Sequence, residues 1–178
     1  MKKGIAKLAK KCYNFFTRRK GGSHMNTFGQ VDSVDFAIYL NEKAKIKGFS
    51  PNVTKIHKWL YACYGASLAL NDEQLLDERP KAWDYGPAFP RVHKKQKRNN
   101  NTLDGLSYKT PLDELQKHDA IIDVVLDHFG SWTASELVHW THEPGKAWHK
   151  KFNSNSKYQN LDNLDITIDF KRYVANGV

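Results

Sequence analysis

The tightest cluster of titratable side chains in this sequence is formed by His139, His142 and Glu143. A zinc-protease helix requires two His residues four positions apart, with a Glu beside the first of them. Here the two His residues are three positions apart and Pro144 follows the Glu directly, so the spacing does not fit that motif. We therefore expect no metal site. The favoured interpretation is that His142 and Glu143 form hydrogen bonds that fix a turn.

Other catalytic signals are weak. The sequence has no Gly-x-Ser-x-Gly motif and no Gly-rich phosphate loop, and no cofactor is expected. Cys63 lies on the apolar stripe of a predicted helix, which favours a buried structural thiol over a nucleophile. Asp84 and Glu143 could act as paired carboxylates only if the fold brings them together. A hydrolase that uses Asp84, His142 and Glu143 is therefore kept as an alternative.

Two stretches, residues 81–90 and 141–148, combine aromatic residues with Gly and Pro. Gly permits backbone angles that other residues avoid, and Pro fixes φ, so both stretches are interpreted as rigid turns. We expect Trp83 and Tyr85 to pack between the central helix and the second turn. The residues expected to form this structural hub or a partner-binding face are Trp59, Trp83, Asp84, Tyr85, Gly86, Pro87, Trp140, Thr141, His142, Glu143 and Trp148.

The net charge of +9 suggests nucleic acid until it is located along the chain. Residues 1–22 hold eight Lys or Arg and no acid, so residues 23–178 carry only +1 of that total. An argument for nucleic-acid binding from the overall charge therefore fails. The basic residues within 91–98 leave a nucleic-acid-binding regulator open as a further alternative. We interpret residues 94–102 as an exposed loop, because aromatic residues do not alternate with the basic ones.

The helical segments must position these turns. The pattern predicts a mainly α, compact single-domain fold of about six to eight helices, with at most a short extended segment near 82–86. No apolar run reaches the ~18 residues that cross a bilayer, and two Cys residues offer no disulfide framework, so a cytoplasmic setting is expected. The predicted helices cover 34–47 with Ser33 as cap, 51–71 with Ser50 as cap, a segment from Pro90, 111–129 with Thr110 as cap, 134–142, a turn around Trp148, and 166–174.

The N-terminal region differs from the rest. Gly22-Ser23-His24-Met25 is typical of a cloning scar, so we divide the chain into a basic amphipathic helix (1–20), a linker (21–25) and the domain proper (26–178). The competing interpretations of residues 1–20 are a fused toxin or ligand peptide, a native extension and an expression leader. Membrane contact is expected only through this segment. Its apolar face consists of Ile5, Leu8, Cys12, Phe15 and Phe16.

Four segments together resemble a known family. They are residues 53–61, 81–90, 141–148 and Ile166-Thr167, and they follow the order of the motifs of the Panacea antitoxin domain, also described as GepA-like or SocA-like. The resemblance runs from about Val31 to Tyr173. Departures occur at Ala88, Phe89 and His93, and in residues 144–147 before the last Trp.

The resemblance implies a non-enzymatic antitoxin of a bacterial or phage toxin–antitoxin pair. Its partner would be a cognate protein or peptide toxin, neutralised by direct binding. A protease would be a second partner if the protein acts as an adaptor. No specific nucleic acid is expected. We further hypothesise that residues 1–20 are a small basic toxin, or a toxin-derived helix, whose apolar face lies in a groove of the domain.

Overall fold

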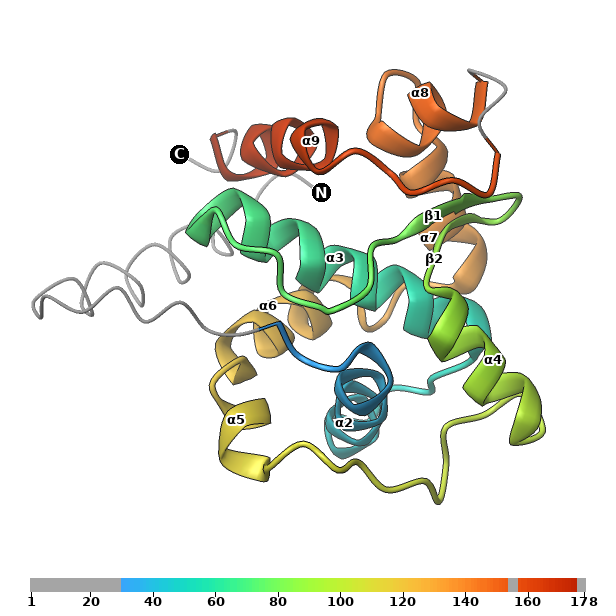
Figure 1. Cartoon of the computed structure of the whole chain (residues 1–178), viewed down its shortest axis with the longest axis vertical. Coiled ribbons are helices and arrows are strands. Elements are labelled where there is room, and N and C mark those ends of the chain that lie inside the picture. Colours follow the sequence, from blue (N-terminus) through green and yellow to red (C-terminus); the bar gives the residue numbers. More distant parts are fainter. Residues whose placement is uncertain (1–29, 154–156, 176–178) are drawn as a thin grey trace, which may run out of the picture.

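The computed structural model describes residues 30–153 and 157–175. Within these residues the chain forms eight helices and one short two-stranded hairpin (Figure 1). The predicted mainly α fold class is therefore confirmed. The elements are α2 (Ser33–Ile46), α3 (Val53–Asn71), β1 (Lys81–Trp83), β2 (Gly86–Ala88), α4 (Pro90–Arg98), α5 (Leu112–Gln116), α6 (Asp119–Phe129), α7 (Ala134–His142), α8 (Ala147–Asn153) and α9 (Asn163–Ala175).

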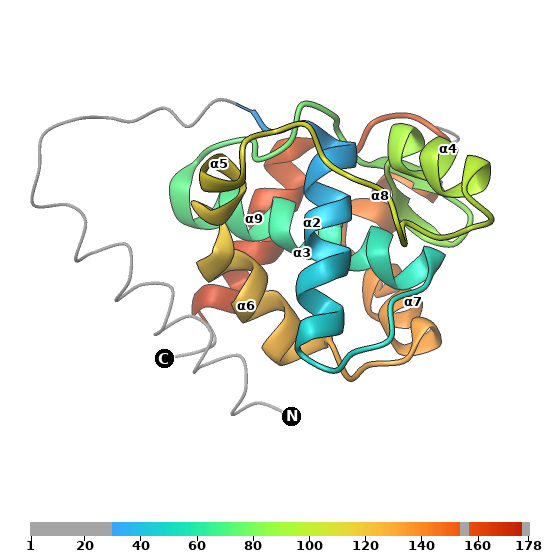
Figure 2. The same cartoon turned by 90° about the horizontal axis from the view of Figure 1, so that it is seen from below.

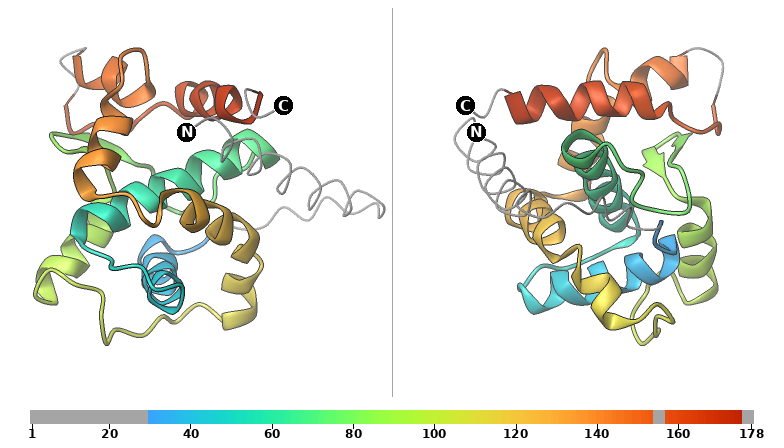
Figure 3. Two further views of the ribbon diagram at one scale, coloured as in Figure 1. Left: turned by 180° about the vertical axis from the view of Figure 1, so that it is seen from behind. Right: turned by 60° about the vertical axis from the view of Figure 1, so that its left-hand side comes forward.

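Helix α3 is the central element, as its apolar sequence predicts. It lies between α9 on one side and α2 on the other, and α6 packs beside it (Figures 1 and 2). Gly65 permits the close approach of α9, because a Cβ at this position would lie 2.2 Å from the ring of Phe170. Figure 3 shows α3 and α9 side by side in two further views. The predicted central role of this helix is confirmed, and Cys63 is buried in it as expected.

The hairpin lies against one end of α3. Its register pairs Lys81 with Ala88, Ala82 with Pro87 and Trp83 with Gly86. A later segment extends it on the β1 side: the Ala82 amide donates to the carbonyl of Gln159 (2.9 Å), and the Tyr158 amide donates to the carbonyl of Ala82 (2.8 Å). Residues that are about 75 positions apart therefore form one small sheet-like layer.

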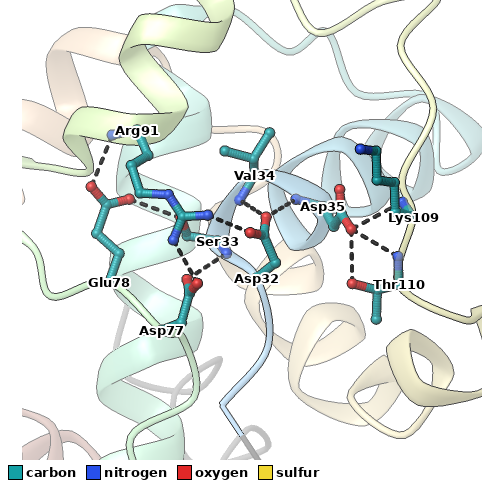
Figure 4. A network of polar contacts seen from close by, with 9 residues as sticks. All are labelled: Asp32, Ser33, Val34, Asp35, Asp77, Glu78, Arg91, Lys109 and Thr110. Carbon is teal, nitrogen blue, oxygen red and sulfur yellow. Dashed lines mark hydrogen bonds and ion pairs between the residues drawn. The ribbon is translucent and has the colours of Figure 1, made fainter.

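A polar network fastens the start of α2 to α4 (Figure 4). The Asp32 carboxylate accepts hydrogen bonds from the amides of Val34 and Asp35 at 2.9 Å, so it caps α2. The Arg91 guanidinium donates to Asp32 and also to Asp77 (2.5 Å). Because Arg91 belongs to the first turn of α4, this network helps to set the direction in which the chain leaves β2.

Several predicted caps are wrong by one or two residues. Asp32, not Ser33, caps α2, since its carboxylate reaches two free amides. Asn52 caps α3 through the Lys55 amide (2.9 Å), so this helix begins at Val53 rather than at Pro51. The last helix begins at Asn163 rather than at 166. Among the described helices, the predicted capping box at Thr133 and Glu136 is confirmed, with both reciprocal bonds present.

Two predicted segments differ in kind. One helix was expected over 111–129, but the chain forms α5 and α6 with a break at residues 117–118, where neither Gly nor Pro signals it. Thr110 does not cap a helix; its hydroxyl donates to Asp35 (2.8 Å). The expected loop at 94–102 is wrong over residues 94–98, because α4 continues to Arg98 with the side chains of Val92 and Gln96 buried, whereas residues 99–102 lie outside the helix as expected.

Candidate functional site

Three of the motif segments meet at one place. Lys58 in α3 is only 2% exposed, and its ammonium donates to the carbonyl of Pro87 in β2 at 3.0 Å. Thr141, at the end of α7, is also buried, and its hydroxyl approaches Gly86 of β2 from the same side as the Lys58 ammonium. We call the set Lys58, Gly86, Pro87, Thr141, His142 and Trp148 the motif hub. It joins α3, β2, α7 and α8.

Gly86 allows this convergence. Its φ of +95° lies in the region that favours glycine. A Cβ at Gly86 would lie 2.6 Å from the Thr141 hydroxyl and 2.8 Å from the Lys58 ammonium. A side chain at Gly86 would therefore have to displace the Thr141 hydroxyl and the Lys58 ammonium.

An aromatic stack closes the hub. The ring of His142 stacks on Trp148 with centroids 3.6 Å apart and an interplanar angle of 1°, and Phe152 stacks on the other side of Trp148 at 4.4 Å. The Trp148 indole nitrogen donates to the carbonyl of Trp83 at 2.8 Å. This bond ties α8 to the last residue of β1.

Burial controls the charges of the hub. It lowers the pKa of the Lys58 ammonium to about 7, because burial disfavours the charged form. Within the described residues no carboxylate forms an ion pair with Lys58 that would offset this effect. Burial also lowers the pKa of His142 to about 4, and the nearby charge of Lys58 acts in the same direction. Nε2 of His142 is buried without a hydrogen-bond partner among the described residues. His142 is therefore neutral at pH 7.

His57, the neighbour of Lys58 on α3, supports the chain that leaves the hub. Its Nδ1 accepts a hydrogen bond from the Phe89 amide at 3.3 Å, so the neutral ring carries its proton on Nε2. Burial lowers the pKa of His57 to about 3, and the charges of Lys58 and His93 add to this effect. The imidazole thus acts as a fixed acceptor at the junction of β2 and α4.

The arrangement does not bring the hydrolase candidates together. Asp84 accepts a hydrogen bond from the Tyr158 hydroxyl (2.6 Å), and Glu143 forms an ion pair with Lys146 (2.9 Å). His142 contacts neither carboxylate through any interaction within the described residues. Burial also raises the pKa of the Cys63 thiol. Within the same residues, no group of three or more His, Cys, Asp or Glu side chains is placed to hold a metal ion.

The structure buries most of the predicted aromatic residues. Trp59, Trp140 and Trp148 belong to the core, and Trp83 is half-buried, packing edge-on against His93 at 5.0 Å. The expectation that Tyr85 packs between the central helix and the second turn is wrong, because its side chain is 78% exposed. In a continuous strand, side chains alternate between the two faces, and Tyr85 would share a face with Trp83. Tyr85 instead belongs to the turn between β1 and β2, where this alternation of side chains ends.

Sequence reasoning did not single out Lys58 as a site residue. The available signal was its position: a Lys within a helix that is apolar over most of its circumference must be buried or reach past its neighbours. Nothing local indicated that its acceptor would be a carbonyl 29 residues further along. The predicted face of residues 1–20, formed by Ile5, Leu8, Cys12, Phe15 and Phe16, lies outside the described residues.

The fold and the hub define a mainly helical domain in which three sequence motifs hold a β-hairpin against the central helix. The sequence model of one family, described as "Antitoxin SocA-like, Panacea domain", matches residues 56–149, a range that contains every residue of the hub. The chain belongs to this family. No curated protein and no solved structure matches it. None of the described helices is both long enough and apolar enough to cross a membrane.

Family membership suggests an antitoxin of a toxin–antitoxin system and implies a cognate toxin as its partner. This agrees with what the resemblance in the sequence implied. Residues from three of the family's sequence motifs form the buried hub.

Proposed function

We propose that this protein is a non-enzymatic antitoxin that neutralises its toxin by direct binding. The observation that carries the proposal is the family match over residues 56–149, together with the roles of the motif residues inside that range. Lys58 bonds to Pro87, Thr141 borders Gly86 and His142 stacks on Trp148. Through these contacts the motif residues hold α3, β2, α7 and α8 together.

Co-expression with candidate toxins tests this proposal. The probes are the proteins encoded on either side of this chain's coding sequence, each expressed from an inducible promoter with and without the full-length chain. We expect one of them to arrest growth alone, to be tolerated with the chain, and to co-purify with it. The proposal fails if no probe is toxic, or if the toxic one stays toxic in the presence of the chain.

The amount of toxin separates binding from a protease-adaptor role. Neutralisation by sequestration leaves the toxin at its normal abundance in a stable complex. An adaptor instead lowers the toxin level, and a protease-deficient host restores toxicity. The second result would contradict neutralisation by binding alone.

The finer hypothesis that residues 1–20 are a fused basic toxin is tested separately. Its basis is the sequence pattern of that segment, in which basic residues alternate with the apolar face formed by Ile5, Leu8, Cys12, Phe15 and Phe16. Peptide 1–20 expressed alone should arrest growth, and supplying the full-length chain should not add toxicity. Normal growth of cells that express the peptide would reject this hypothesis and leave the antitoxin proposal unaffected.

A further inference from the structure

The tip of the hairpin exposes an aromatic side chain that the fold does not use. Asp84 and Tyr85 form the turn between β1 and β2, and Tyr85 is 78% exposed. No hydrogen bond or ring contact links its side chain to any of the described residues. Tyr85 therefore contributes little to the core, yet it lies between Trp83 and Gly86, which are both held firmly.

The backbone that carries Tyr85 is rigid. Trp83 is fixed on one side by the Trp148 indole (2.8 Å) and on the other by its pairing with Gly86. Asp84 is held by the Tyr158 hydroxyl at 2.6 Å. A side chain on a fixed turn loses little conformational freedom when a partner binds it, which favours affinity.

A second exposed tyrosine is hydrogen-bonded to the same turn through Asp84. Tyr158 is 53% exposed and has a φ of +64°, which is rare for a bulky residue. Its amide donates to Ala82, and its hydroxyl donates to Asp84, so the surrounding bonds maintain this unfavourable conformation. Such strain is concentrated at functional sites, where the surrounding structure maintains it for a purpose other than packing.

Positive charge borders the two tyrosines. The Lys157 ammonium lies 4.3 Å from the centre of the Phe152 ring and 3.9 Å from the Asp84 carboxylate, and its side chain is half-exposed. Asp84 is the single carboxylate at the turn and already accepts from Tyr158. The ion pair between Lys157 and Asp84 is long and half-exposed, so exchanging Asp84 for a carboxylate of a partner would cost little free energy.

We propose that Tyr85, Tyr158 and Lys157 form the surface that binds the toxin, which we call the tip surface. The partner that fits it is a folded protein with an apolar pocket for a phenol ring, bordered by a carboxylate that pairs with Lys157. Tyrosine supplies a large apolar area with a polar end, and it is enriched among residues that dominate binding energy. This inference rests on the proposed antitoxin function.

The test compares full-length variants against the toxin identified by the growth assay. Tyr85→Ala should weaken binding by at least about 30-fold in calorimetry, the effect of a dominant interface residue. Tyr85→Phe should weaken it by less than about threefold, because the ring is kept. Ile46→Ala is the matched control, since Ile46 is 81% exposed at the far end of α2 and should bind as the wild type does.

A charge reversal tests the partner's chemistry. Lys157→Glu should weaken binding by about tenfold and reduce its salt dependence, because one opposite-charge pair is lost. Leu164→Ala tests a rival surface, since Leu164 is 69% exposed on α9. Thermal midpoints of all variants should stay within about 2 °C of the wild type, as expected for surface changes in a chain of this size.

Three results would overturn the tip surface. In the first, Tyr85→Ala binds as tightly as the wild type. In the second, Leu164→Ala weakens binding more than Tyr85→Ala does. In the third, Tyr85→Ala converts a wild-type dimer into a monomer, which would assign the tip to a second copy of this chain. In each case a wild-type chain that still neutralises the toxin leaves the antitoxin proposal standing, whereas a wild type that neutralises nothing rejects that proposal instead.

Discussion

The two halves of the motif at residues 81–90 face opposite environments. Gly86 and Pro87 point into the hub, where Lys58 and Thr141 surround them. Tyr85, the neighbour of Gly86, is almost fully in solvent. Adjacent residues of one motif can therefore serve separate purposes: the inner half packs within the fold, and Tyr85 in the outer half is exposed to solvent.

The difference also concerns how many contacts hold each half. The inner half contacts side chains from α3 and α7, so a change there must displace buried groups. The outer half is restrained through its backbone, through the bond between Asp84 and Tyr158, and through the long ion pair between Asp84 and Lys157. Substitutions in the inner half should accordingly alter stability, while those in the outer half should alter binding.

The largest expected effect comes from Gly86→Ala. The new Cβ would meet Thr141 and Lys58 at less than 3 Å, with φ in the region unfavourable for Ala. We expect a loss of about 3 kcal/mol in the free energy of unfolding, measured by urea denaturation. Gly48→Ala is the control: it has a similar φ of +81° but no atom within 4 Å, so it should lose about 1 kcal/mol. Equal losses in the two variants would contradict the crowding argument.

The next effect is the pH dependence that Lys58 confers. Burial lowers its pKa to about 7, so between pH 7 and 10.5 the unfolded chain binds more protons than the folded one. Stability from this group must then rise with pH across that window. Lys58→Met should remove on the order of 2 kcal/mol of the rise between pH 7 and 10. Parallel curves of unfolding free energy against pH for wild type and variant would show that folding does not lower the pKa of Lys58.

A smaller effect is expected in acid. His142 has its pKa lowered to about 4, so between pH 6.5 and pH 4 the unfolded chain binds more protons and stability falls as pH falls. Lys58, His139 and His149 are the charged or titratable groups that act on it. His142→Phe keeps a ring to stack on Trp148 and should flatten this part of the curve. An unchanged acid limb would assign the loss to His57 instead.

The smallest expected effect on stability is that of Tyr85→Ala. Because Tyr85 is 78% exposed, its truncation should change the free energy of unfolding by less than about 0.5 kcal/mol. Urea denaturation of this variant beside Gly86→Ala compares the two halves directly. A loss above about 2 kcal/mol for Tyr85→Ala would remove the distinction between them.

Local signals account for the parts of the fold that were predicted. The capping box at Thr133 and the apolar face of α3 depend on residues within one helical turn of each other. The same signals failed at the break between α5 and α6, where no Gly or Pro marks the end of a helix. They also failed at 94–98, where α4 continues with Val92 and Gln96 buried despite a basic sequence.

The sequence by itself determined the helical class, the central helix, the rigid turns and the family that the motifs indicate. Only the tertiary structure decided that Lys58 is buried against Pro87, that Gly86 has no room for a side chain, and that Tyr85 is exposed. The physical reason is the distance along the sequence over which each kind of interaction acts. Caps and periodicity act over about four residues. Burial and close contact depend on segments that lie 29 to 77 positions apart and meet only when the chain has folded.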